Sequence, residues 1–140
     1  MKTRRKIQIR AVAVSALICA YPLFVLSYTW WHVFSSDLPG GRGGPLDAYR
    51  HTLASAVVAY TLDDTVVEVI TSLTERGGRD SNAMGRHNNR IGATIGSQAG
   101  SFAEIEPTVY AQVSDGEVNT QSDSRTTWLP EDRWGHASVW

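Results

Sequence analysis

Residues 85–100 read GRHNNRIGATIGSQAG, and their spacing decides how this chain of 140 residues folds. Ile91 and Ile95 stand four positions apart, which is the spacing of one buried face of a helix. Four further residues also recur at four-residue intervals, and three of them have no side chain: Asn88, Gly92, Gly96 and Gly100. Since a glycine inside a helix costs roughly 0.5 to 1 kcal/mol relative to alanine, this stripe predicts that another backbone comes unusually close.

The expected partner of the glycine stripe is a helix at about residues 45–62. Pro45 suits the first helical position. Five apolar residues then recur at steps of three and four, as on one buried helical face: Leu46, Tyr49, Leu53, Val57 and Tyr60. Small residues on the same helix let a second backbone approach it: Ala54, Ala56 and Ala59.

The rest of the chain predicts a small all-α domain. Asp63 and Asp64 are good caps for a helix that ends at Gly77 and Gly78. A polar loop follows at 79–85, and the helix with the glycine stripe then stops before Pro107. The prediction is a domain of about three packed helices at 46–106 and an irregular tail at 107–140. Within this tail, the stretch VYAQV fits either a short helix or a strand.

The first forty residues predict a membrane anchor. From Ala11 to Trp31 the chain has 21 residues without a charge, about enough to cross a bilayer core of roughly 30 Å. Five basic residues precede this stretch: Lys2, Arg4, Arg5, Lys6 and Arg10. They predict a cytoplasmic segment 1–10, an anchor at 11–34 and a Gly/Pro tether at 35–45. The expected location is a bacterial inner membrane, crossed once, with the domain periplasmic or extracellular. A cleaved signal peptide is the alternative.

Composition excludes several classes of protein. The formal net charge is -1, so no basic field indicates a nucleic-acid partner. The single cysteine, Cys19, lies in the apolar stretch, which excludes an intramolecular disulfide and a cysteine-based zinc site. The expected partners are the membrane, through residues 11–34, and an envelope protein, through the tryptophan-rich tail. Oligomerisation is left open.

Polar residues on two predicted helices form a candidate site. Asp47 and His51 stand one helical turn apart beside Arg50. His87, Asn88 and Asn89 stand together on the helix with the glycine stripe, and Glu75 precedes the loop between them. If the two helices pack together, Asp47, His51 and His87 are expected to converge. Such a set suits a divalent metal or a metal-free general base, whereas the structural alternative is a network that fixes helix packing.

Two short motifs resemble an uncharacterised bacterial family of small helical domains, often found in secreted or toxin-like proteins. The family carries D-A-[FY]-R-H, a later acidic position and M-D-x-H-N-N-x-x-G. Here residues 47–51 read DAYRH, Glu75 follows, and residues 84–92 read MGRHNNRIG. The resemblance implies that seven residues act together: Asp47, Arg50, His51, His87, Asn88, Asn89 and Gly92. Gly85 replaces the aspartate of the family pattern, and Thr74 stands where a histidine often precedes the glutamate.

Three functions follow from these observations. The first is a hydrolase of lipid or cell-wall material that uses His51, His87, Asp47 and Glu75. The second is a non-enzymatic component of an envelope assembly such as a secretion or conjugation system. A third rests on residues 74–85, TERGGRDSNAMG, which are similar to part of the lytic transglycosylases, where Glu75 would be acid and base.

Overall fold

The computed structural model describes residues 2–119, 122 and 124–135, and it is all-α apart from one short strand pair. The two strands pair in parallel, Glu117 with Thr127 and Val118 with Trp128. In chain order the elements are α1 (Lys2–Ser35), α2 (Pro45–Thr61), α3 (Asp64–Thr74), α4 (Asp80–Gln98), the 3₁₀ helix η1 (Phe102–Glu104), α5 (Ile105–Ser114), β1 (Glu117–Val118), β2 (Thr127–Trp128) and the 3₁₀ helix η2 (Glu131–Arg133).

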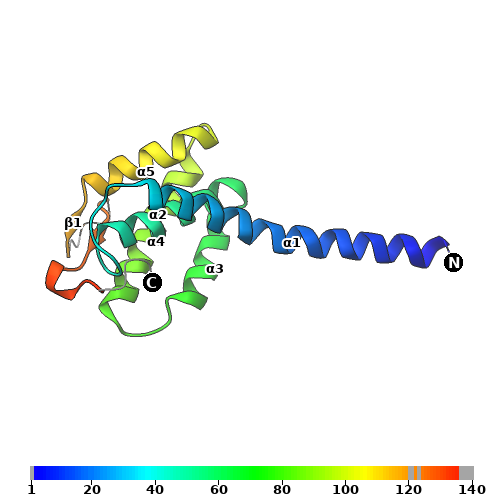
Figure 1. The fold of residues 1–140 in the computed structure, drawn as a ribbon, viewed down its shortest axis with the longest axis horizontal. Coiled ribbons are helices and arrows are strands. Elements are labelled where there is room, and N and C mark those ends of the chain that lie inside the picture. The colour runs from blue at the N-terminus through cyan, green and yellow to red at the C-terminus, as the bar shows by residue number, and fades with distance from the viewer. Residues whose placement is uncertain (1, 120–121, 123, 136–140) are drawn as a thin grey trace.

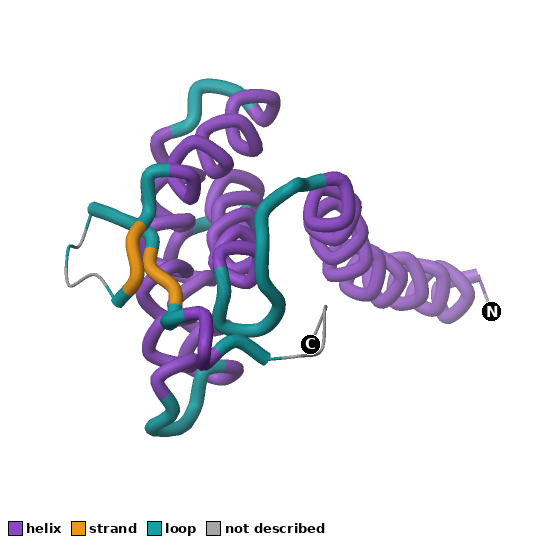
Figure 2. The backbone as a smooth tube through the Cα atoms, turned by 60° about the vertical axis from the view of Figure 1, so that its left-hand side comes forward, coloured by secondary structure: helices purple, strands orange, loops and turns teal. Residues whose placement is uncertain are grey.

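Helix α1 has two parts with different surroundings. Its first part stands clear of the other helices, and residues 5–20 are exposed (Figures 1 and 2). Its second part packs on the domain, where Val25, Thr29 and Val33, four residues apart, are buried. The helix is long and apolar enough to cross a membrane. The predicted anchor at 11–34 is therefore one helix, but its second half also belongs to the folded domain.

Helices α2 and α4 touch through their backbones, as the glycine stripe predicts. A Cβ atom on Gly92 would lie 2.2 Å from the carbonyl oxygen of Thr52, and one on Gly96 would lie 2.1 Å from that of Ala56. No side chain fits at those distances. Gly100 differs, because it lies beyond the end of α4 and faces the Glu104 carboxylate. The close approach therefore depends on two glycines of the predicted three.

A fourth domain helix, α5, completes the core, so the predicted boundary at residue 106 is too early. The largest fully buried apolar side chains come from α2 and α5 in matching steps of four: Tyr49, Leu53, Val57, Ile105, Val109 and Val113. Pro107 was expected to follow the last helix. It lies instead in the first turn of α5, where the N–H that proline lacks has no intrahelical partner in any case.

Helix α4 begins earlier and ends earlier than the sequence predicts. The expected polar loop at 79–85 is helical from Asp80 onward, and the acidic side chain of Asp80 suits a helix N-terminus. The helix ends at Gln98 because Ala99 is extended. The Glu104 carboxylate then accepts the N–H of Gly100 and the hydroxyl of Ser101, which fixes the turn that follows.

The tether between α1 and α2 is part of the fold. Its limits agree with the predicted 35–45, but its glycines make specific contacts. Gly43, at φ +87°, donates its N–H to Asp47 Oδ2 at 2.8 Å and accepts the N–H of Leu129. The Trp134 ring lies against the tether glycines Gly40 and Gly44, and its Nε1 donates to the Leu129 carbonyl. Trp140 lies outside the described residues.

Candidate functional site

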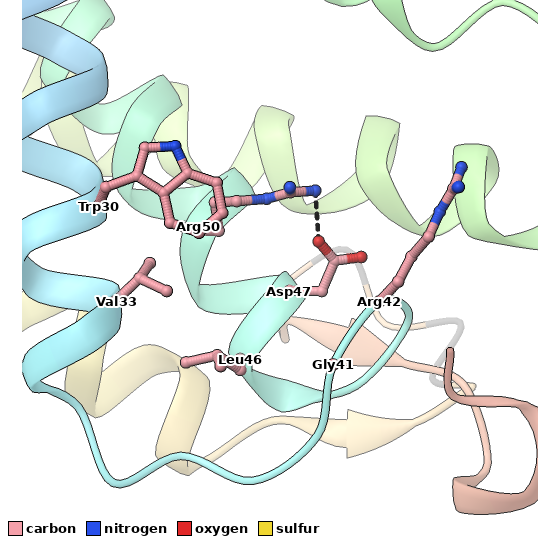
Figure 3. Close-up of a pocket in the computed structure, with 7 residues that line it drawn as sticks. All are labelled: Trp30, Val33, Gly41, Arg42, Leu46, Asp47 and Arg50. Atoms are coloured by element: carbon pink, nitrogen blue, oxygen red, sulfur yellow. Dashed lines mark ion pairs between the residues drawn. The ribbon is translucent and has the colours of Figure 1, made fainter. Parts of the chain in front are cut away.

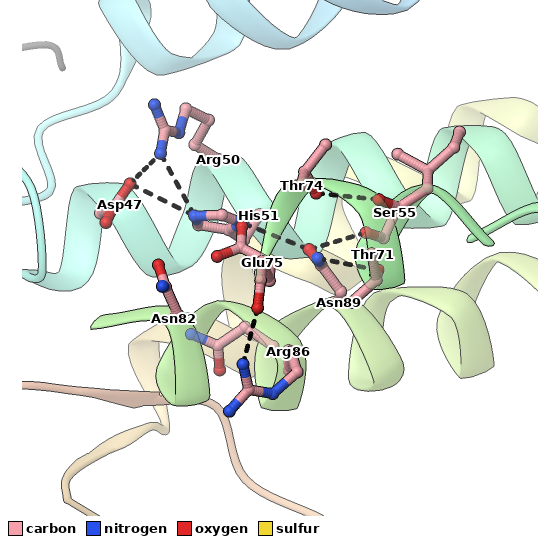
Figure 4. Close-up of polar contacts among 12 residues, drawn as sticks. Asp47, Arg50, His51, Ser55, Thr71, Thr74, Glu75, Asn82, Arg86 and Asn89 are labelled. Carbon is pink, nitrogen blue, oxygen red and sulfur yellow. Dashed lines mark hydrogen bonds and ion pairs between the residues drawn. The ribbon is translucent and has the colours of Figure 1, made fainter. Parts of the chain in front are cut away.

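A polar cluster joins α2, α3 and α4 around the imidazole of His51 (Figure 4). The Nε2 atom of His51 faces Arg50 at 3.2 Å and Asp47 at 3.7 Å. Its Nδ1 atom faces Asn89 at 3.3 Å and Glu75 at 3.5 Å. The two carboxylates therefore face the two different nitrogen atoms of one ring.

The neighbours of His51 select one neutral form of its ring. Arg50 carries hydrogen-bond donors and no acceptor, so its Nη2–H donates to the lone pair of His51 Nε2. The ring hydrogen is then on Nδ1, which donates to Asn89 Oδ1. This assignment follows from the hydrogen-bond network. It directs an N–H, rather than a lone pair, toward Glu75.

The Glu75 carboxylate occupies space that Gly85 leaves open. Glu75 follows the last residue of α3, and its side chain is 11% exposed. A Cβ atom on Gly85 would lie 2.9 Å from the carboxyl carbon of Glu75. Arg86 fixes the local backbone by donating to the main-chain oxygen of Glu75 at 2.7 Å. A side chain at position 85, where the resembled family has an aspartate, would therefore displace the Glu75 carboxylate.

Asp47 and Arg50 connect this cluster to α1 and the tether (Figure 3). Arg50 pairs with Asp47 Oδ1 at 2.5 Å, and its guanidinium lies 5.7 Å from the ring centre of Trp30 on α1. The other carboxylate oxygen of Asp47 accepts the Gly43 N–H. Asp47 is buried and both of its oxygens are engaged, so its first role is to hold the start of α2 on the tether.

The two asparagines have different partners. Asn89 Oδ1 accepts from Ser55 at 2.9 Å as well as from His51, and its Nδ2 donates to Thr71 Oγ1 at 3.0 Å. Asn88 is fully buried and binds the backbone of Thr127 twice, accepting its N–H and donating to its carbonyl oxygen. Asn89 therefore belongs to the His51 cluster, whereas Asn88 holds β2 on α4.

His87 does not join Asp47 and His51, so the expected convergence is not found. Its Nε2 lies 2.6 Å from the carbonyl oxygen of Arg125 in the tail. The reason is helical geometry: at 3.6 residues per turn, His87 points about 160° away from the face that carries Gly85 and Asn89. The metal candidates Asp47, His51 and His87 are thus divided, and the part of the chain that the structure describes contains no group of three His, Cys, Asp or Glu placed to hold an ion.

The His51 cluster forms the inner end of a large cleft between α1, α2 and α3. The cleft has a volume of about 660 Å³, within the range of roughly 300–1,000 Å³ that small-molecule sites occupy. Its walls are mostly apolar, and they include Pro22, Val25, Leu26, Val58, Val66 and Ile70. Its polar end includes Arg50, His51, Ser55, Thr71, Glu75 and Asn89.

Sequence reasoning missed Thr71 as a member of this site. Thr71 stands one helical turn before Glu75 on α3, so the two share a face, and this spacing was the available signal. The cleft itself could not be predicted, because it depends on the distance between α1 and α3.

Comparison with known protein families, with curated proteins and with solved structures found no match to this chain. What the site can do therefore follows from its own chemistry. The cleft offers the Glu75 carboxylate beside the His51 imidazole, the Arg50 guanidinium, and apolar walls that lead to them.

Proposed function

We propose that this chain is a membrane-anchored hydrolase of amphiphilic envelope material, with Glu75 as the general base and His51 as the residue that positions it. One observation carries the proposal: the Glu75 carboxylate lines the polar end of a mostly apolar cleft, with the Nδ1–H of His51 at 3.5 Å. A carboxylate in such surroundings is a common choice for acid and base catalysis.

The chemistry uses residues that already face one another. Glu75 takes a proton from a water molecule, and the water oxygen attacks the carbonyl carbon of an ester in the substrate. The bond to the alcohol then breaks, and Glu75 returns the proton to the departing oxygen. Arg50 also lines the cleft, and its positive charge stabilises the negative charge that develops on the carbonyl oxygen.

The proposed location is the outer side of a bacterial inner membrane. The basic residues before Ala11 favour a cytoplasmic N-terminus under the positive-inside rule. Tyr28, Trp30 and Trp31 stand at the other end of the apolar stretch, where aromatic residues are favoured. The domain would then meet periplasmic or extracellular substrates.

The test is hydrolysis by the full chain in detergent micelles, with envelope lipids as substrates and fatty-acid release measured by mass spectrometry. Glu75→Gln removes the base but keeps the shape of the side chain. The expected loss is about 10²- to 10⁴-fold in rate, with an unchanged melting temperature. Glu68→Gln is the matched control, because Glu68 is an exposed carboxylate on the same helix that does not line the cleft.

Two results would contradict this proposal. One is a wild-type chain that releases no product from lipids or cell-wall fragments. The other is a Glu75→Gln variant as active as Glu68→Gln, which would assign any activity to other residues or to a contaminant.

A second function is favoured because the polar atoms of the cluster already have hydrogen-bond partners within it. In this function the chain is a non-enzymatic envelope component whose polar residues fix the packing of α2, α3 and α4. His51 and Asn89 use their hydrogen-bonding atoms on one another and on Ser55, Thr71 and Arg50. For this function, Asn89→Ala lowers the stability by about 1–3 kcal/mol, and no substrate is turned over. Co-purification of the full chain with envelope complexes would then identify its partner.

A further inference from the structure

We propose that the cleft between α1, α2 and α3 binds one acyl chain of a bilayer lipid, which enters sideways from the leaflet on the domain's side. That this lipid is the substrate of Glu75 rests on the proposed function. The binding of the acyl chain is supported by three separate features of the molecule.

The first feature is the length of α1 that is free of the domain. Ten uncharged residues separate Arg10 from Tyr21, which at 1.5 Å per residue is about 15 Å, or half of a bilayer core. Tyr21 is already tied to the domain, because its hydroxyl lies 2.5 Å from Thr61 Oγ1 at the end of α2. The second half of the apolar stretch therefore lies beside α2 and α3, so a lipid chain next to α1 can reach the cleft.

The second feature is the distribution of side chains on α3. Val66 and Ile70 line the cleft, and Val69 and Leu73 beside them are more than half exposed. The acidic Asp64 and Glu68 border a separate hollow on the side of α4. An apolar helix face left open to water is unfavourable. Helix α1, which forms one wall of the cleft, is long and apolar enough to cross a membrane, so lipid is the apolar medium next to this face.

The third feature is a buried polar group without a partner. Thr29 of α1 lines the cleft and is 2% exposed, and its hydroxyl has no hydrogen-bond partner among the described residues. Such a group is costly unless a ligand or water satisfies it. The ester oxygen of a lipid, above its acyl chain, is an acceptor for this hydroxyl.

The experiment uses the full chain in vesicles that contain a phosphatidylglycerol with a diazirine in one acyl chain. After illumination, adducts are mapped by peptide mass spectrometry. We expect them on α1 and α3 at the cleft, at Val25, Val66 and Ile70. Ala54→Phe fills the cleft and should reduce the adducts by about tenfold, the loss expected when roughly two methylene groups are excluded. Ala111→Phe, exposed on α5, should leave them unchanged.

A second pair of variants tests the proposal independently if Ala54→Phe does not fold. Ile70 and Val69 are both exposed neighbours on α3, but Ile70 lines the cleft and Val69 does not. Ile70→Phe should reduce the adducts, and Val69→Phe should not. Adducts spread evenly along the exposed face of α1, or equal adducts in both pairs, would overturn the proposal. So would labelling by a soluble diazirine fatty acid but not by the phospholipid.

The two proposals fail in different ways. Adducts at the cleft in both wild type and Glu75→Gln, without any hydrolysis, would support lipid binding and contradict the enzyme. Hydrolysis that depends on Glu75, without adducts at the cleft, would support the enzyme and overturn lipid binding.

Discussion

Helices α3 and α4 both pack on α2, but they do so in opposite ways. Helix α4 brings Gly92 and Gly96 against the carbonyl oxygens of α2, so the two backbones touch. Helix α3 buries one of its residues, Val67, and leaves apolar side chains exposed. The α4 side of α2 is therefore closely packed, whereas the α3 side is packed incompletely and leaves a cleft.

The largest expected effect comes from adding a side chain to the α2–α4 contact. Helix propensity alone predicts that Gly96→Ala gains roughly 0.5–1 kcal/mol. The structure predicts a loss of about 1–3 kcal/mol, because the new Cβ meets the Ala56 carbonyl oxygen and the helices must separate. Denaturant unfolding measures the sign. Gly78→Ala is the control, since its Cβ would meet nothing within 4 Å. A stabilised Gly96→Ala variant would show that α4 does not pack on α2 more closely than α3 does.

The next effect tests whether α4 also holds the tail. Asn88→Ala removes two hydrogen bonds to the buried backbone of Thr127, and the expected loss is about 2 kcal/mol. Amide exchange of Thr127 should become faster in the same variant. His87→Ala is the matched control, because the hydrogen bond of His87 to the Arg125 carbonyl oxygen is at the surface. This variant should have little effect on stability. Equal losses in the two variants would show that Asn88 has no special role.

A smaller effect is expected on α3. Leu73 is 56% exposed, so Leu73→Ser should change the stability of the domain in detergent by less than about 0.5 kcal/mol. Val67→Ala, which truncates the buried residue of the same helix, should cost more. A Leu73→Ser variant as unstable as Val67→Ala would mean that α3 is packed as closely as α4.

The smallest expected effect concerns the cap of α3. Hydrogen bonds from the hydroxyl and the backbone N–H of Thr65 hold the pKa of Asp63 below its usual value. Because this pKa is lowered by folding, the ionised Asp63 stabilises the folded chain at pH values above its ordinary pKa. This stabilisation is lost as the pH falls through the lowered pKa of the folded chain. The protection factors of amides in the first turn of α3, which correct for the intrinsic pH dependence of exchange, should therefore be lower in acid than at neutral pH. Asp63→Ala should show low protection factors at both pH values.

Much of the fold could be predicted from the sequence, because periodicity and glycine spacing are local signals. The limits of α2, the cap at Asp63 and the glycine contact were predicted and are confirmed. Helix α5 was predicted only as one of two alternatives for VYAQV, because Pro107 ends one helix or begins another depending on which carbonyl groups lie before it. The early start of α4 was hidden because its first turn is polar.

Less of the candidate site could be predicted. Asp47, Arg50, His51 and Asn89 are brought together, and Glu75 joins them as expected from its place in the chain. His87 was misplaced because adjacency in the motif does not mean adjacency on a helix, where neighbouring residues point about 100° apart. The cleft depends on how α1 returns to the domain, and a hydropathy pattern that predicts a membrane span carries no information about that contact.

The backbone contact at Gly92 and Gly96 also has a genetic consequence. When two side chains clash, a smaller residue on the partner can restore the fit. Here the obstacles are the peptide oxygens of Thr52 and Ala56, and every residue has such an oxygen. A screen for suppressors of Gly96→Val should therefore recover no compensating change at position 56, and recovered revertants should restore glycine itself.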